Sequence, residues 1–126
     1  MVKTILVRCV DPRFGEEWSA PVLEAVGPHY CLTELGGIDT LGDDGFNVLV
    51  AKAEALLGIN PAIERLVVLF HQDCAWCKAQ SISDPEQLNL ARRLTKRLAE
   101  AFSSLKVDMG EVDTNGKVTL VASKAA

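Results

Sequence analysis

Short unbroken runs of hydrophobic residues alternate along this chain with longer segments in which hydrophobic residues recur at helical spacing. Residues 5–7 and 66–70 are such runs, and their lack of polar alternation is typical of strands buried on both faces. Residues 15–27, 43–58 and 83–102 instead place their apolar side chains on one helical face each. This alternation of strands and helices predicts an α/β fold with a mostly parallel central sheet.

Three further predicted strands and two signals for helix starts complete the predicted elements. Residues 29–35 are the predicted second strand, residues 105–112 the fourth, and residues 117–122 an antiparallel fifth strand that follows a D-T-N-G hairpin turn. Ser19 is the predicted cap of the first helix, and the S-D-P-E sequence from Ser83 is a capping box for the last helix. We therefore expect helices on both faces of the sheet, connected by right-handed crossovers.

Composition and charge describe one globular domain and narrow the range of its partners. The 126 residues are enough for a single domain, 1–126, and too few for two. A net charge of -4 argues against nucleic acid or an anionic membrane as the main partner, because both attract basic surfaces. The sequence contains no hydrophobic run of membrane-spanning length and no signal-peptide pattern at its start, so we expect a cytoplasmic location. The four cysteines are then expected to be thiols or metal ligands rather than disulfides.

The candidate chemistry lies directly after the two buried runs. Cys9 follows the first run, and His71 and Cys74 follow the second. The carboxyl ends of parallel strands meet at one edge of a sheet, so these three side chains come together if the two strands are neighbours. Cysteine and histidine are the usual ligands of zinc, and catalytic zinc sites keep a fourth position for water. Asp11 and Arg13 are an acid and a base that can pair beside the same spot.

The pattern C-x-D-x-R, followed some sixty residues later by H-x-x-C, resembles the β-class carbonic anhydrases. The resemblance continues outside these motifs. TELGGIDT at residues 33–40 is similar to the family's second strand and its glycine-rich loop, and IERLVVLFHQDC at residues 63–74 is similar to its third strand. VDMGEVDTNGKVTLV at residues 107–121 is similar to its closing strand and hairpin, so the likeness covers almost the whole chain. It implies a β-carbonic-anhydrase-like fold, for which we predict the strand order 2-1-3-4 plus the antiparallel fifth strand.

The resemblance also implies an activity, namely the zinc-dependent reversible hydration of carbon dioxide to bicarbonate by a carbonate dehydratase, a lyase. Cys9, His71 and Cys74 would hold Zn²⁺. Asp11 would accept the proton of a zinc-bound hydroxide and so aim the hydroxide at carbon dioxide, and Arg13 would hold Asp11. In some family members the carboxylate binds the zinc instead. The active sites of the family lie at a dimer interface and act on a small-molecule substrate, so a homodimer with such a substrate is implied here as well.

Departures from the family pattern leave several alternatives open. Pro12 stiffens the loop after Cys9, and Trp76 brings a bulky indole close to the site. Cys77 is interpreted first as a buried thiol, but it could also form a redox pair with Cys74 or close a Cys3His zinc site. The fourth zinc position therefore stays open between Asp11, water and Cys77. The function stays open between carbon dioxide hydration, hydrolysis of carbonyl sulfide or carbon disulfide, and a non-catalytic zinc-binding role.

Three remaining expectations concern the surroundings of the site. The backbone at Gly36 and Gly37 is expected to line the pocket. His29 and Cys31 are expected to be structural residues of the second strand, and Trp18 to be part of the core or of an interface. The first predicted strand begins at Lys3, so the helices with which family members embrace a partner subunit have no counterpart in this sequence.

Overall fold

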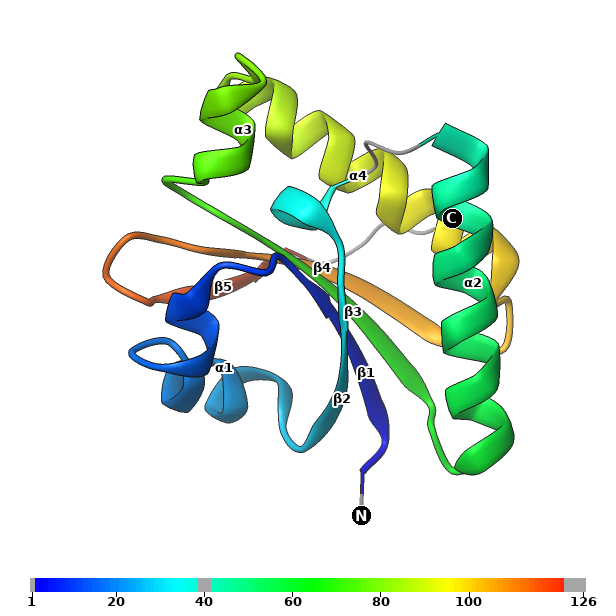
Figure 1. The fold of residues 1–126 in the computed structure, drawn as a ribbon. Coiled ribbons are helices and arrows are strands. Elements are labelled where there is room, and N and C mark those ends of the chain that lie inside the picture. The colour runs from blue at the N-terminus through cyan, green and yellow to red at the C-terminus, as the bar shows by residue number, and fades with distance from the viewer. Residues whose placement is uncertain (1, 39–41, 122–126) are drawn as a thin grey trace.

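A twisted sheet with helices on both faces forms the centre of the molecule (Figure 1). The structure is a computed structural model, and it describes residues 2–38 and 42–121. Within these residues the sheet has five strands in the order β2-β1-β3-β4-β5, of which the first four are parallel and β5 is antiparallel to β4. The strands are β1 (Thr4–Arg8), β2 (His29–Thr33), β3 (Arg65–His71), β4 (Lys106–Val112) and β5 (Val118–Val121). The predicted fold class and strand order are confirmed.

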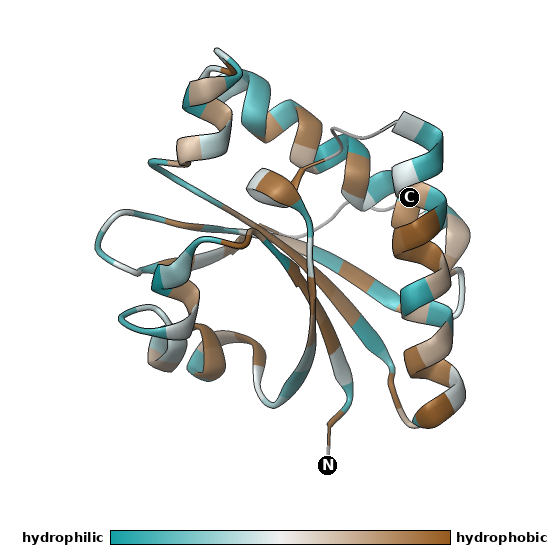
Figure 2. Ribbon diagram, in the orientation of Figure 1, coloured by the Kyte–Doolittle hydropathy of each residue, from teal (hydrophilic) through white to brown (hydrophobic). Residues whose placement is uncertain are grey.

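The two unbroken apolar runs occupy the middle of this sheet. Residues 5–7 in β1 and residues 66–69 in β3 have no solvent exposure, because helices cover both of their faces. In β2, at the edge of the sheet, exposed and partly buried residues alternate instead. In Figure 2 the central strands are largely brown, the colour of hydrophobic residues, whereas the helices carry both brown and teal segments.

Four α-helices and two short 3₁₀ helices connect the strands within the described residues. They are η1 (Pro12–Gly15), α1 (Ser19–Val26), η2 (Leu35–Gly37), α2 (Gly42–Ile59), α3 (Ala75–Ala79) and α4 (Asp84–Ala101). Helices α2 and α4 pack their apolar sides on one face of the sheet, and α1 packs on the other (Figure 1). No helix in the described part of the chain is both long and apolar enough to cross a membrane.

The predicted capping box at the start of α4 is present. The Ser83 hydroxyl accepts a hydrogen bond from the Glu86 backbone N–H at 3.3 Å, and the Glu86 carboxylate accepts one from the Ser83 backbone N–H, also at 3.3 Å. These bonds satisfy two of the backbone donors that a helix start leaves unpaired. The start of α4 is thus fixed within a few residues of the H-x-x-C motif.

The prediction of Ser19 as the cap of α1 is wrong. Trp18 is the N-cap residue and makes no side-chain capping bond, while the Ser19 hydroxyl donates to the Glu16 carbonyl at 2.8 Å. The reason is that the chain already turns before Ser19, because the Trp18 backbone N–H bonds to the Arg13 carbonyl at 2.8 Å. A turn built by the preceding 3₁₀ helix replaces the side-chain cap.

Three predicted strand boundaries also need correction. The second strand ends at Thr33 rather than at residue 35, since Gly36 has φ of 70° and turns the chain into η2. The fourth and fifth strands begin one residue later than predicted. Residues 39 and 40 of the 33–40 segment and residue 122 of the predicted fifth strand lie outside the described residues.

Candidate metal centre

The pairing of β1 with β3 brings the three predicted ligand residues to one edge of the sheet. Val7 is opposite Val68 in this parallel pair, so Cys9, just beyond β1, lies level with Phe70. His71 is the last residue of β3, and Cys74 is the N-cap residue of α3. The carboxyl ends of two neighbouring central strands therefore supply all three side chains, as the sequence predicted.

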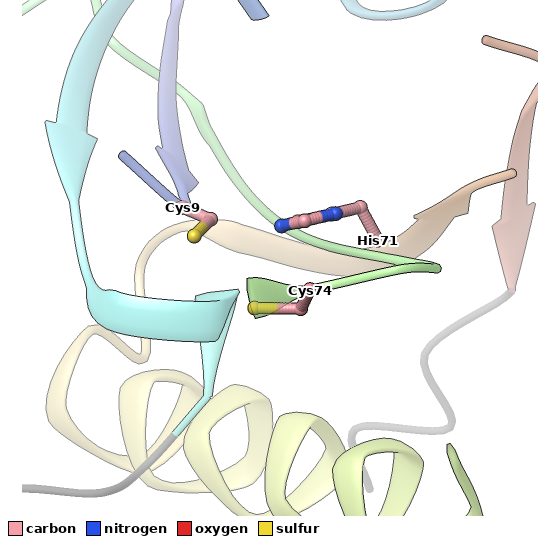
Figure 3. A group of neighbouring side chains, drawn as sticks. All are labelled: Cys9, His71 and Cys74. Carbon is pink, nitrogen blue, oxygen red and sulfur yellow. The ribbon is translucent and has the colours of Figure 1, made fainter. Parts of the chain in front are cut away.

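Cys9, His71 and Cys74 form a compact and buried group. One potential ligand atom from each residue lies within 4.8 Å of the other two. The exposed fractions are 3% for each cysteine and 0% for His71. Figure 3 shows the two sulfur atoms and one ring nitrogen of His71 around a common space. This geometry could hold a metal ion.

The imidazole of His71 is oriented as a metal ligand would be. Its Nδ1 lies 2.8 Å from the Gln72 carbonyl oxygen, and because a carbonyl only accepts, Nδ1 carries the proton. The lone pair is therefore on Nε2, which is buried and has no hydrogen-bond partner among the residues that the structure describes. Buried polar atoms are rarely left unpaired, and a backbone carbonyl that fixes the ring is the usual partner of a metal-bound histidine. A cation beside Nε2 would satisfy it.

The glycine pair after β2 contacts the group through its backbone. The Gly36 N–H donates a hydrogen bond to Sγ of Cys9 at 3.2 Å. A Cβ added at Gly36 would lie 3.0 Å from Sγ of Cys77, and one added at Gly37 would lie 2.3 Å from the Leu69 carbonyl oxygen. Both glycines also have positive φ values, so the loop reaches the site only because these residues lack side chains.

Asp11 and Arg13 form the ion pair that the sequence predicted. Nε and Nη2 of Arg13 donate to the two oxygens of the Asp11 carboxylate at 3.0 Å and 2.9 Å, and the Arg13 backbone N–H adds a third bond at 2.9 Å. These hydrogen bonds lower the pKa of Asp11 below its ordinary value, although partial burial acts in the opposite direction. Asp11 is therefore ionised at neutral pH. Its Oδ2 lies 4.0 Å from Nε2 of His71, beside the candidate ligand group.

Arg13 also contacts a residue that sequence reasoning missed. Its Nη2 donates to the backbone carbonyl of Asp73 at 3.0 Å, and its Nη1 lies 3.4 Å from the Asp73 carboxylate. Asp73 has φ of 56°, an unusual value for a residue other than glycine, and its carboxylate also pairs with Lys78. The guanidinium group lies 4.2 Å from the centre of the Trp18 ring. The position of Asp73 inside H-x-x-C was the only sequence signal.

Cys77 is a neutral thiol next to the group. Burial, together with a hydrogen bond to Cys74 and the nearby charges, raises the pKa of the Cys77 thiol to about 12. Its sulfur packs against Gly36, and it is not among the three residues of the compact group. These observations favour the interpretation of Cys77 as a buried thiol over a fourth zinc ligand.

The remaining residues named from the sequence surround the site or lie away from it. Trp18 is a core residue at 1% exposure, and its ring centre lies 5.3 Å from that of His71. Trp76 is partly buried and packs on the core cluster that contains Cys74. In β2, the His29 ring bonds to the Gly27 carbonyl at 2.7 Å, while Cys31 is exposed.

Comparisons with known proteins find the same fold at low sequence identity. No protein-family model matches this sequence, and no curated protein matches it. Among solved structures, the β-carbonic anhydrase CafA of Aspergillus fumigatus aligns with a TM-score of 0.59 and 14% identity over 99% of this chain and 76% of that one. A tetrameric β-carbonic anhydrase of Sordaria macrospora gives 0.59 and 14% over 95% and 80%. The β-carbonic anhydrase CcaA gives 0.50 and 11% over 95% and 80%. This likeness defines the fold class of the chain as β-carbonic-anhydrase-like.

Proposed function

We propose that this protein is a zinc-dependent carbonic anhydrase that catalyses the reversible hydration of carbon dioxide to bicarbonate and a proton. One observation carries the proposal: the buried group of Cys9, His71 and Cys74 lies directly beside the ionised Asp11 and its partner Arg13. The shared fold with β-carbonic anhydrases supports it independently, although a fold alone does not define an activity.

Zinc is the metal that this donor set fits. Two cysteine sulfurs and one neutral imidazole nitrogen are typical zinc ligands, and two thiolates balance the charge of Zn²⁺. Tetrahedral zinc requires its ligand atoms to be about 3.5–3.8 Å apart, so atoms within 4.8 Å need to close by only about an ångström. Zinc bound there would act as a Lewis acid that lowers the pKa of water to roughly 7 and so supplies hydroxide at neutral pH.

Asp11 orients the attacking water in this proposal. Its Oδ1 already accepts two hydrogen bonds from Arg13, whereas its Oδ2 accepts only one and lies nearer to His71. Oδ2 thus has a free lone pair with which it can accept a hydrogen bond from the nucleophile and point the nucleophile's own lone pair at the carbon of carbon dioxide. Arg13 keeps the carboxylate ionised, because it lowers the pKa of Asp11.

We assign the fourth coordination position to solvent. Arg13 holds the Asp11 carboxylate at both of its oxygens, and moving it onto a metal would break those bonds. Cys77 is not among the three residues of the compact group, and its sulfur packs against Gly36, so it would also have to leave its place. An open position is what separates a catalytic zinc site from a structural one.

Metal analysis and stopped-flow hydration assays test the proposal. The purified protein, supplied with zinc under reducing conditions, should retain one zinc ion per chain and accelerate carbon dioxide hydration. Asp11→Ala should keep the zinc and lose most of the activity, and Cys77→Ser should change neither property. A parent protein that binds zinc but is no faster than buffer would contradict the enzymatic assignment.

The same assay separates the alternative functions. Activity on carbonyl sulfide or carbon disulfide, without carbon dioxide hydration, would identify a hydrolase of these related small molecules. Zinc that is lost in Cys77→Ser, together with no activity on any of the three substrates, would identify a closed and non-catalytic site.

We also propose that the protein forms a homodimer in the cytoplasm. The Sordaria macrospora enzymes with the same fold are tetrameric, and Leu120 and Val121 of the edge strand β5 expose apolar surface that self-association could cover. All four cysteines are free, which suits a reducing compartment. Sedimentation velocity tests the assembly, and a monomer at all working concentrations would contradict it.

A further inference from the structure

A buried glutamine links the glycine loop η2 to the end of β3. Gln87 lies in the first turns of α4 and is 3% exposed, although the neighbouring inward positions Ala91 and Leu94 of the same helix are apolar. Its amide nitrogen donates to two backbone carbonyl oxygens, that of Gly36 at 3.2 Å and that of His71 at 3.0 Å. Both hydrogens of one NH₂ group are thereby used.

One of these carbonyl groups belongs to a residue that contacts a candidate ligand, and the other belongs to a candidate ligand itself. Gly36 donates its own N–H to Sγ of Cys9, so the bond from Gln87 fixes the residue that supports the Cys9 sulfur. His71 is itself a candidate ligand at the end of β3. One side chain thus sets the position of the glycine loop relative to His71, and with it the separation between the Cys9 sulfur and the imidazole.

We propose that Gln87 is a positioning residue of the metal centre, which holds Cys9 and His71 at the separation that zinc requires. This inference rests on the metal site of the proposed function, but it does not require that the site be catalytic. Outer residues that orient the ligands commonly change metal affinity by about tenfold to a hundredfold when they are replaced.

The chemistry of this position favours glutamine over its nearest substitutes. A carboxylate from glutamate would face two carbonyl oxygens with no hydrogen to donate. Methionine would match the length of the side chain but leave two buried carbonyls without a donor. The capping box at Ser83 supports the arrangement, because it fixes the start of α4, and the Gln87 backbone N–H bonds to the Ser83 carbonyl at 2.9 Å.

The test compares Gln87→Met and Gln87→Glu with a matched control on the same helix. Thr95 is also buried, and its hydroxyl bonds only within the helix, to the Ala91 carbonyl at 2.7 Å. Thr95→Val therefore removes a buried hydrogen bond of α4 without touching the glycine loop or His71. Zinc affinity is measured by competition with a chromophoric chelator, and the ligand geometry by the absorption spectrum of the cobalt-substituted protein.

We expect both Gln87 variants to bind zinc about tenfold to a hundredfold more weakly than the parent and to shift the cobalt spectrum, while Thr95→Val retains the affinity and spectrum of the parent. Parental affinity and an unchanged spectrum in a folded Gln87 variant would overturn the proposal, as would an equal loss of affinity in Thr95→Val. If Gln87→Met does not fold, Gln87→Asn gives the same comparison, because asparagine keeps the amide group but is one methylene too short to reach both carbonyl oxygens. A parent that binds zinc without hydrating carbon dioxide would refute the proposed function and leave this comparison valid, whereas a parent that binds no zinc would refute both.

Discussion

Replacing Arg13 with methionine should destabilise the protein and also change how its stability depends on pH. Arg13 makes two side-chain hydrogen bonds to Asp11 and one to the Asp73 carbonyl, and it lies over the Trp18 ring. Methionine keeps much of the aliphatic packing and removes the charge and all of these bonds.

The size of the loss follows from the burial of the pair. Fully buried hydrogen bonds to charged groups contribute about 1.5–3 kcal/mol, whereas exposed ion pairs contribute less than about 1 kcal/mol. The side chains of Arg13 and Asp11 are 22% and 13% exposed, which lies between these limits but closer to the buried one. We therefore expect Arg13→Met to lower the free energy of unfolding by about 1–3 kcal/mol near neutral pH.

The sign of the pH effect follows from the direction of the pKa shift. The pKa of Asp11 is lower in the folded protein than in the unfolded chain, so this carboxylate stabilises the fold above its unfolded pKa of about 4. That stabilisation is lost as the pH falls through the folded pKa. The difference between the parent and Arg13→Met should thus be full near neutral pH and shrink as the solution is acidified below about pH 4.

Urea unfolding at a series of pH values measures this difference, with Arg65→Met as the control. Arg65 makes an ion pair of similar burial with Asp108, at 2.9 Å and with 24% and 12% side-chain exposure, near the opposite end of the sheet. Arg65→Met should destabilise the fold but leave zinc binding and the rate of carbon dioxide hydration unchanged, whereas Arg13→Met should reduce that rate. The reasoning would be refuted if Arg13→Met lowered the free energy of unfolding by the same amount near neutral pH and near pH 3. It would also be refuted if a double-mutant cycle with Asp11→Asn gave a coupling energy below about 0.5 kcal/mol.

Three further predictions concern the metal centre. Cys74→Ser should release most of the zinc, whereas Cys77→Ser should retain it, which metal analysis after gel filtration distinguishes. Gly37→Ala should lower the free energy of unfolding in urea by at least about 2 kcal/mol, because its Cβ would lie 2.3 Å from the Leu69 carbonyl oxygen. The control Gly15→Ala should be nearly neutral, because its Cβ would have no described atom within 4 Å. A chelator should lower the melting temperature of the zinc-loaded protein. Free zinc at a thousand times its dissociation constant adds about 4 kcal/mol to the free energy of unfolding, and the chelator removes this contribution. An unchanged melting curve would argue against a bound metal.

The central strands and the ligand group could be predicted because continuous apolar runs leave few choices. Residues 5–7 and 66–70 have no polar face, so both strands had to be covered on both sides and lie inside the sheet. Once they are parallel neighbours, Cys9 and His71 necessarily emerge at the same edge. The pairing of Asp11 with Arg13 was equally local, because only one residue separates them.

The supporting contacts could not be predicted in this way, because they depend on how distant segments pack. Gln87 occupies an inward position of a mostly apolar helical stripe, and its partners Gly36 and His71 lie 51 and 16 residues away in sequence. The bond from Arg13 to Asp73 spans 60 residues and depends on the unusual backbone conformation of Asp73. The prediction of Ser19 as an N-cap residue was wrong for a similar reason, because the preceding turn and not the local sequence determines where α1 begins.

The ligand group itself is the strongest argument that this fold serves a metal. A sheet of this kind needs apolar side chains at its buried edge, and nothing in its packing requires two cysteines and a histidine there. Among the described residues, Nε2 of the fully buried His71 has no hydrogen-bond partner, which costs stability unless a cation or a donor lies beside it. A cation held by Cys9, His71 and Cys74, as proposed above, would give Nε2 of His71 the partner that it lacks among the described residues.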